Sequence, residues 1–365
     1  MTAIFYIVLA VLIPAGIVVI YNYFAAPVIK IRTGEKSGED LISVLIPARN
    51  EEKNISNCLK SVTGQDYPKL EILVLDDNSE DNTFREAEAF SKKDPRIKVL
   101  KGEPLPSEFT GKNWACHQLS QSASGKYLLF IDADVILEES VVSSAYQEVK
   151  RLNLGLLSVF PTQQMHSLGE WLIVPLMNWL LLTFLPLYLV YSNKSHSLAA
   201  ANGQFMFFSR PAYDSAGGHY SINSSIVEDM VFVRQLKQKN IPVKTFLGGE
   251  LVFCRMYNDF NSSFEGFSKN FYPGFGINPS AFLITLSILT FSFSLPIIMV
   301  FIDKIFILPL MLIILQRILI SSKSGQHIVI NLLFHPLQII MLFLLGINSV
   351  IVSKKKNRQW KGRTF

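Results

Sequence analysis

Apolar residues gather in long runs at the two ends of the chain. The first run is Ile4 to Phe24, and three more cover residues 280–302, 305–320 and 328–352. About 20 consecutive apolar residues form a helix long enough to span a bilayer. Since 49% of the 365 residues are hydrophobic and the mean hydropathy is +0.30, the chain is too apolar for an ordinary soluble protein.

These runs divide the chain into parts. We expect an uncleaved N-terminal anchor at 1–26, a globular domain at 38–275, membrane helices at 276–353 and a basic tail at 354–365. The first run has no basic residue before it and is followed by Lys30, Arg32 and Lys36. The positive-inside rule then predicts a multi-pass protein of the cell membrane whose globular domain is cytosolic.

The tail conflicts with a simple count of spans. An anchor followed by three full crossings would put the lysine-rich tail outside, against the positive-inside rule. His335-Pro336 interrupts the last apolar run, so we expect this run to turn back and leave the tail in the cytosol.

Cysteine usage and charge exclude several functions. Cys58, Cys116 and Cys254 are far apart and form no Cys-x-x-Cys, which argues against a zinc site and a disulfide framework. The net charge of +5 includes the basic cluster at 354–358, which suits an anionic membrane leaflet. No basic and aromatic patch occurs in the globular part, so no nucleic-acid partner is expected.

Between residues 40 and 270 the chain alternates strand-like and helix-like segments, which predicts an α/β domain with a mostly parallel sheet. The expected strands are 41–46, 70–75, 97–100 and 127–131, and the expected helices are 54–62, 81–90 and 113–122. Polar clusters follow three of the strands, at 47–52, 76–79 and 132–134. Each alone could be a capped turn, but together they stand where open α/β sheets bind ligands. Neither a Gly-x-Gly-x-x-Gly motif nor a P-loop is present.

The most informative of these clusters is Asp132-Ala133-Asp134, at the end of the expected strand Tyr127 to Ile131. Residues two apart on an extended chain point to the same side, so both carboxylates would face one divalent cation and a diphosphate. A solvated surface turn is the alternative. A second acidic pair, Glu228-Asp229, follows about a hundred residues later.

The order of these motifs resembles the family 2 glycosyltransferases of the GT-A type, which bind nucleotide sugars. The resemblance covers about residues 40–270 and rests on Pro47-Ala48-Arg49-Asn50-Glu51, Asp76-Asp77-Asn78-Ser79, Gly111-Lys112, Asp132-Ala133-Asp134 and Glu228-Asp229-Met230. It implies a GT-A domain with a mostly parallel sheet and a UDP-sugar donor.

The resemblance also implies roles at the donor end of the site. Asp132 and Asp134 would hold Mg²⁺ or Mn²⁺ across the phosphates, and Lys112 would add positive charge unless it is an exposed loop lysine. Asp77, helped by Asp76, would hydrogen-bond the uracil or ribose. The remaining residues expected to line the nucleoside pocket are Pro47, Ala48 and Glu51.

Asp229 is the expected general base, at the start of a helical run from Met230 to Lys239; a helix N-cap is the alternative. A carboxylate there would deprotonate an acceptor hydroxyl opposite the diphosphate, which predicts inversion. By resemblance, the acceptor site would comprise Asn202, Gly203, Gln204, His219, Glu228 and Lys269. His219 could equally be a surface histidine. The Gln-x-x-Arg-Trp motif of processive synthases is absent, so we expect transfer of one sugar.

Within the family the chain looks closest to membrane enzymes that glycosylate lipids, particularly bacterial glucosyltransferases of C30 carotenoid acids. This closer match rests on residues 111–116, 254–257, 265–270, 335–336 and 360–363. A carboxylate acceptor, with a pKa near ~4 to 5, needs no base at neutral pH. A ceramide-like, hopanoid or diacylglycerol hydroxyl therefore stays open, as does a polytopic scaffold or transport protein.

A further apolar stretch, residues 171–191, contains Pro175 and Pro186. If it crossed the membrane once, Asp134 and Asp229 would lie on opposite sides of the bilayer. We therefore expect an interfacial or re-entrant helix, with Trp171 and Trp179 at headgroup level. A buried core helix is the alternative.

Overall fold

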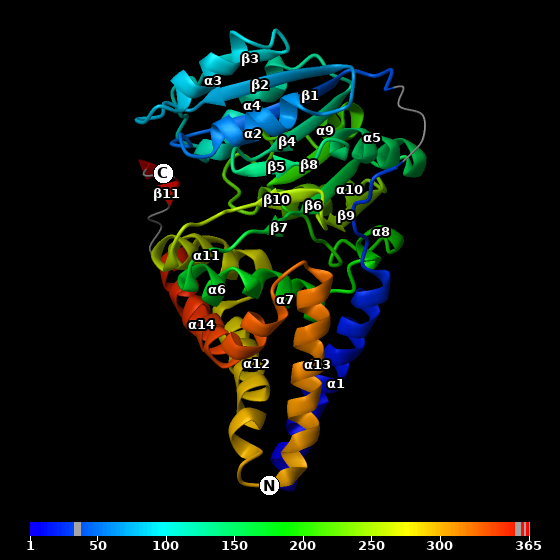
Figure 1. Ribbon diagram of the computed structural model, residues 1–365, viewed down its shortest axis with the longest axis vertical. Helices are drawn as coiled ribbons and strands as arrows, with labels where there is room; N and C mark the ends of the chain where they lie inside the picture. Colours follow the sequence, from blue (N-terminus) through cyan, green and yellow to red (C-terminus); the bar gives the residue numbers. More distant parts are fainter. Residues whose placement is uncertain (33–37, 355–358, 361–362, 365) are drawn as a thin grey trace. The chain divides into compact units, whose positions relative to one another are not determined.

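The computed structural model describes residues 1–32, 38–354, 359–360 and 363–364 (Figure 1). Its chain forms two compact units. The globular unit comprises Pro27–Thr162, Leu189–Cys254 and Gln359–Phe365, and the helical unit comprises Met1–Ala26, Gln163–Tyr188 and Arg255–Arg358. The segments 163–188 and 255–275, which we expected within the globular domain, thus group with the helices.

The globular unit is built on a seven-stranded sheet with the order β3-β2-β1-β4-β8-β6-β9. Strands β1 to β4 run parallel, β8 is antiparallel to β4 and β6, and β9 is parallel to β6. The sheet is therefore mostly parallel, as predicted. The bounds are β1 Ile42–Ala48, β2 Leu70–Asp76, β3 Ile97–Lys101, β4 Tyr127–Ile131, β6 Leu156–Phe160, β8 Phe205–Ser209 and β9 Val243–Leu247.

Amphipathic helices cover this sheet. In α2 the buried residues Ile55, Cys58, Leu59 and Val62 recur at helical spacing, which gives the helix one apolar face. The helices of this unit are α2 Ile55–Thr63, α3 Thr83–Ser91, α4 Gly111–Ser122, α5 Val141–Leu152, α8 Leu189–Ser192, α9 Arg210–Ser215 and α10 Glu228–Gln238. Strand β5 (Val135–Leu137) pairs antiparallel with β10 (Val252–Cys254), and β7 is Thr162–Gln163.

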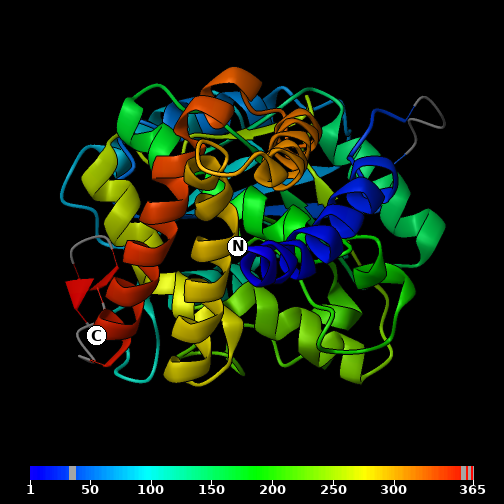
Figure 2. The same ribbon diagram turned by 90° about the horizontal axis from the view of Figure 1, so that it is seen from below.

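The helical unit contains four helices that are long and apolar enough to cross a membrane, among the residues that the structure describes. They are α1 Thr2–Ala25, α12 Pro279–Met299, the segment Lys304–Lys323, in which η1 (Lys304–Phe306) leads into α13 (Ile307–Lys323), and α14 Ile328–Lys354 (Figure 2). Their length and composition indicate membrane association. Three shorter helices complete the unit: α6 Leu168–Ile173, α7 Pro175–Phe184 and α11 Phe260–Phe275.

Helix α14 corrects the expectation that the last apolar run turns back. The helix continues through Pro336 to Lys354 without a break. His335 is buried, and its ring lies near the backbone carbonyl of Phe293 at 3.3 Å from Nε2. The side of the membrane on which the tail lies stays a prediction, and its basic residues 355–358, like Lys36 after the anchor, lie outside the described residues.

The apolar stretch at 171–191 is broken into short helices rather than forming one span. Trp179 on α7 is only 1% exposed and packs edge-on against Phe293 of α12 and Phe184. Protein therefore surrounds the ring, and its predicted depth at headgroup level stays a prediction. Asn22 of α1 donates to the carbonyls of Leu182 and Leu185, at 2.8 and 2.7 Å, which ties α1 to the end of α7. An interfacial or re-entrant course of the whole stretch stays a prediction.

A buried carboxylate fixes the start of α6. Glu170 is fully buried, accepts hydrogen bonds from the backbone N–H groups of His166 and Ser167, and pairs with Arg255 at 3.0 Å. The Ser167 hydroxyl accepts from the Glu170 N–H, which completes a capping box.

We expect Glu170→Ala to lower the free energy of unfolding by about 3 kcal/mol, because it leaves two backbone donors and a guanidinium without their acceptor. Thermal unfolding of the detergent-solubilised protein measures the loss. Glu265→Ala, at an exposed position on α11, is the control and should change stability by less than about 0.5 kcal/mol. Equal stability of the two variants would contradict the role of Glu170.

Candidate active site

The predicted clusters meet at one edge of the sheet. Strands β2, β1 and β4 are parallel neighbours, and Ala48 at the end of β1 stands opposite Asp76 at the end of β2. Strand β4 ends at Ile131, so Asp132 leaves the sheet at the same edge. The carboxyl ends of parallel strands are the usual ligand-binding edge of an open α/β sheet.

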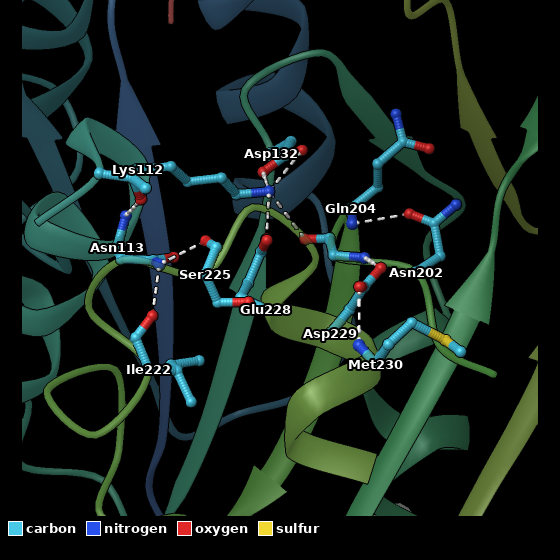
Figure 3. Close-up of polar contacts among 12 residues, drawn as sticks. Lys112, Asn113, Asp132, Asn202, Gln204, Ile222, Ser225, Glu228, Asp229 and Met230 are labelled. Carbon is cyan, nitrogen blue, oxygen red and sulfur yellow. Dashed lines mark hydrogen bonds and ion pairs between the residues drawn. The ribbon is translucent and has the colours of Figure 1, made fainter. Parts of the chain in front are cut away.

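Lys112 is the centre of the site (Figure 3). It stands in the first turn of α4, whose N-cap Thr110 accepts a hydrogen bond from the Asn113 N–H. Its Nζ lies 2.8 Å from Asp132 Oδ1, 3.3 Å from Glu228 Oε1 and 3.4 Å from the Gly203 carbonyl. Burial opposes the charge, but Asp132 and Glu228 raise the pKa of Lys112 well above its usual value. The exposed-loop alternative for Lys112 is thus wrong.

Asp229 lies in the first turn of α10, beside this cluster. Its Oδ2 accepts from the Gly203 N–H at 3.1 Å and its Oδ1 from the Met230 N–H at 2.7 Å. Burial, and then the neighbouring charge of Glu228, raise the pKa of Asp229 to about 7. The helix begins at Glu228 rather than Met230, and its N-cap is Val227, so the N-cap alternative for Asp229 is wrong.

Asp134 faces two buried thiols on the other side of Asp132. It hydrogen-bonds Cys254, and burial raises the pKa of Cys254 and Cys58 above the usual range of a thiol, with Asp134 adding to both shifts. The Cys58 Sγ also lies 3.8 Å from the Asp132 carbonyl. Both thiols are therefore buried beside the acidic cluster, where burial disfavours their thiolate form.

The donor set is consistent with a metal ion held jointly with a ligand. No group of three or more His, Cys, Asp and Glu side chains suited to a metal occurs in the described part of the chain. Mg²⁺ is usually bound by one or two carboxylates together with substrate phosphates and water, rather than by an all-protein cage. Asp132 and Asp134 match that pattern.

Two loops at the ends of β1 and β2 brace each other on the predicted nucleoside side. Arg49 donates from Nη1 to the carbonyls of Asp77 and Asn78, at 2.6 and 2.8 Å. Asn50 and Asn78 have φ values of 52° and 53°, which asparagine adopts more readily than most residues. The braced loops hold Asp76 and Asp77 at the sheet edge.

Asp76 offers an acceptor atom at this edge. Its Oδ2 accepts from the Ser79 N–H at 3.3 Å, whereas its buried Oδ1 has no hydrogen-bond partner among the described residues. Such an orphan is costly unless a ligand satisfies it. Asp77 is fully buried, and Glu51 accepts from the Asn54 side chain at 2.7 Å. Pro47 and Ala48 are buried residues of β1. Contacts of these residues with a nucleoside stay predictions.

The segment 202–204 forms a floor under the acidic cluster. Asn202 is 6% exposed, and its backbone N–H donates to the Ser158 hydroxyl at 2.8 Å. Gln204 is 4% exposed, and its Nε2 lies 2.9 Å from the Cys254 sulfur. Between them, Gly203 bonds both Lys112 and Asp229 through its backbone. The segment thus supports the site through these bonds, and the predicted contacts of its residues with an acceptor stay predictions.

His219 and Lys269 are the other two predicted acceptor residues to be placed. His219 is 1% exposed, its Nδ1 lies 2.8 Å from the Tyr213 hydroxyl, and its ring packs on Phe130 and Phe232. It is a core histidine, so the surface alternative is wrong, and its predicted acceptor role would need an approach that the structure does not show. Burial lowers its pKa well below the usual value. Lys269 lies on α11 of the helical unit, and its acceptor role stays a prediction.

Asn113, which was assigned no role from the sequence, holds a loop of the site with its side chain. Asn113 is 1% exposed, and its Nδ2 lies 2.9, 3.1 and 2.9 Å from the carbonyls of Ile222, Asn223 and Ser225. These carbonyls belong to the loop that leads into Glu228 and Asp229. Asn113 thereby fixes the approach of the second acidic pair to Lys112.

Residues 43–216 match the family model described as Glycosyl transferase family 2. The match supports a glycosyltransferase of the family 2 kind. The chain is therefore an enzyme, and the scaffold or transport alternative is wrong. This glycosyltransferase is 28% identical over 346 residues to the 4,4'-diaponeurosporenoate glycosyltransferase of Staphylococcus aureus (strain USA300), covering 89% of this chain and 88% of that protein.

Another relative and one solved structure extend the comparison. The protein of the same name from Staphylococcus haemolyticus (strain JCSC1435) is 28% identical over 257 residues, covering 67% of the glycosyltransferase and 64% of that relative. The mannosyltransferase PcManGT from Pyrobaculum calidifontis, solved with GDP-Man and Mn²⁺, superposes with a TM-score of 0.53 at 14% identity, covering 97% of this chain and all of that one. The predicted GT-A fold is confirmed.

Gly203→Ala tests how tightly the site is packed. A Cβ at this position would meet Glu228 Oε1 at 2.7 Å and Lys112 Nζ at 3.2 Å. We expect transfer activity to fall by about 10²-fold, since a shift of about 1 Å at a reacting group is that costly, while the thermal midpoint changes little. Gly274→Ala, where a Cβ would meet nothing within 4 Å, is the matched control. Wild-type activity of Gly203→Ala would exclude this close approach as a requirement.

Proposed function

We propose that this enzyme is an inverting, metal-dependent transferase that moves one hexose, glucose by resemblance, from a UDP-sugar to a membrane lipid. The observation that carries the proposal is the convergence of Asp132, Glu228 and Asp229 around Lys112. This arrangement holds carboxylates for a cation, an ammonium for a diphosphate and a carboxyl group of raised pKa within one cluster.

At the donor end, Asp132 and Asp134 would hold Mg²⁺ or Mn²⁺, which neutralises the negative charge of the departing diphosphate. Lys112 keeps its proton throughout the neutral range and presents a full positive charge beside Asp132. Because leaving-group charge develops in the transition state, a fixed ammonium at this position accelerates bond breaking. Asp76 would accept a hydrogen bond from the nucleoside through its unpartnered Oδ1.

At the acceptor end, Asp229 would take a proton. The acceptor oxygen forms a bond to the anomeric carbon while the bond from that carbon to the diphosphate oxygen breaks and its electron pair leaves with the nucleotide. The proton of an acceptor hydroxyl passes to Asp229. Attack from the face opposite the leaving group turns an α-linked donor sugar into a β-glycoside.

The proposed acceptor is a C30 carotenoid acid. Support comes from the printed name of the two staphylococcal relatives, at 28% identity. Four helices of membrane length suit an apolar acceptor that arrives through the bilayer, with the catalytic unit on the cytosolic side where the donor is made. A lipid hydroxyl is the second candidate, and the raised pKa of Asp229 favours it, since only a hydroxyl needs a base.

The pH dependence of transfer separates these acceptors. With a hydroxyl acceptor the active form has Asp229 deprotonated, so kcat/KM should rise with pH through about 7 and lie roughly tenfold below its plateau at about pH 6. With a carboxylic acid the limb should lie near pH ~5, where the acceptor itself ionises. Transfer from labelled UDP-glucose to each lipid, followed by mass analysis of the product, gives both profiles.

Asp229→Asn should lower kcat on a lipid alcohol by about 10²- to 10⁴-fold, abolish the limb near pH 7 and leave UDP binding within twofold. Calorimetric titration with UDP and Mn²⁺ measures binding separately from transfer. Asp214→Asn, at an exposed position on α9, is the control and should behave as wild type. Full activity of Asp229→Asn on an alcohol would refute the base assignment.

Metal removal tests the donor end. A chelator should abolish transfer, and Mn²⁺ or Mg²⁺ should restore it. Asp134→Asn should raise the Mn²⁺ concentration for half-maximal activity at least about tenfold, because one of two anionic ligands is lost. Glu139→Gln, a nearby exposed position, should not change it. Undiminished transfer in the chelator would rule out a required metal.

A further inference from the structure

A positively charged cavity lies in the globular unit, apart from the acidic cluster. It has a volume of about 610 Å³ and is lined by Lys30, Arg32, Arg151 and Lys244, with Glu148 and Phe246 among the remaining wall residues. Four cationic side chains face one carboxylate. Among the described lining residues, the wall therefore carries an excess of positive charge.

The ion pairs described for this cavity involve its two arginines and not Lys30 or Lys244. Glu148 is 7% exposed and pairs with both arginines, with Arg32 through its Oε1 and with Arg151 through its Oε2 at 2.8 Å. Lys244 instead lies over the rings of Phe246 and Tyr191, with its Nζ 4.9 and 5.1 Å from the ring centroids. Burial lowers the pKa of Lys244; the charge of Glu148 opposes this shift, and Arg151 and Arg32 add to it. An anion in the cavity would relieve this repulsion.

The cavity is held in place by the chain that follows α1. Residues 27–32 run beside β9, where the Ile29 N–H donates to the Leu247 carbonyl at 2.9 Å and the Leu247 N–H to the Pro27 carbonyl at 2.8 Å. The Arg32 N–H donates to the Ser144 hydroxyl on α5 at 3.2 Å. These bonds fix the backbone that carries Lys30 and Arg32 on this side of the cavity.

Covalent distance places this wall near the membrane surface. Lys30 comes five residues after Ala25, the last residue of α1. An extended chain advances at most about 3.5 Å per residue, so Lys30 lies within about 18 Å of the end of α1, whatever the orientation of the two units. If α1 spans the bilayer, its end stands at the headgroup layer. Ile31, 56% exposed, adds an apolar side chain beside the cations.

We propose that this cavity binds the phosphate headgroup of an anionic phospholipid and so fixes the globular unit against the membrane surface. Its chemistry suits such a ligand. The ammonium groups of Lys30 and Lys244, which form no ion pair within the described part of the chain, would meet the phosphate, with the arginine pair of Glu148 and an aromatic wall beside them. The proposal rests on the proposed membrane course of α1, but not on the proposed donor, acceptor or catalytic residues.

Native mass spectrometry of the full-length protein in neutral detergent tests this site. Phosphatidylglycerol should remain bound at concentrations where phosphatidylcholine does not. Arg151→Gln combined with Lys244→Gln should weaken phosphatidylglycerol binding about 30-fold, as expected for the loss of two cations. The control combines Lys93→Gln with Lys98→Gln, which removes two exposed lysines. Lys98 lies on β3 and Lys93 shortly before it in the chain, and β3 is the edge strand opposite β9. This variant should change phosphatidylglycerol binding less than twofold.

Lys30→Gln provides a second variant at an exposed position and should weaken binding about fivefold even if the double variant is unstable. Equal binding of phosphatidylcholine, or unchanged binding in both cavity variants, would overturn the site. If millimolar inorganic phosphate displaced phosphatidylglycerol, the cavity would be a site for a soluble anion, and the proposal that it binds a lipid headgroup would be overturned. UDP binding, measured in parallel, should stay unchanged in every variant. Loss of lipid binding can therefore be distinguished from loss of the proposed donor binding.

Discussion

One ammonium group allows the acidic site to exist. Asp132, Glu228 and Asp229 bring like charges together in a partly buried place, where each would disfavour ionisation of the others. Lys112 offsets this repulsion by pairing with Asp132 and Glu228. Asp229, which it does not contact directly, retains a raised pKa. The position of one lysine thus balances the charge of two of the three carboxyl groups.

Backbone groups, rather than long side chains, set the geometry around this lysine. Gly203 accepts from Lys112 and donates to Asp229, so one residue without a side chain spaces the cation and the proposed base. Asn113 holds the loop before α10 by hydrogen bonds to its carbonyls. Because α4 carries both Lys112 and Asn113, a single helix start determines the charge balance and the approach of the acidic pair. Strand register adds the third fixed element, Asp132 after β4.

Local patterns predicted the fold and the strand ends because these depend on neighbouring residues. The strand from Tyr127 to Ile131 was predicted with its observed bounds, since five apolar residues end sharply at an aspartate. Packing between residues far apart in the chain could not be predicted from these local patterns. His219, next to two glycines, has the sequence context of a surface turn, yet Phe130 and Phe232 enclose it. Trp179 has the sequence context of an interfacial anchor, yet Phe293, more than a hundred residues later in the chain, packs against its ring.

The proton on Asp229 connects the site to the nature of the acceptor. A pKa of about 7 means that the protonated and ionised forms coexist near neutrality. The ionised form can accept a proton from a hydroxyl, whereas the protonated form can donate a hydrogen bond to a carboxylate. An acidic pair beside the acceptor is therefore compatible with a carboxylic acid as well as an alcohol. In the proposed reaction a bound diphosphate would compete for Lys112, weaken its field at Asp229 and so favour the protonated carboxyl, because Lys112 lowers the pKa of Asp229.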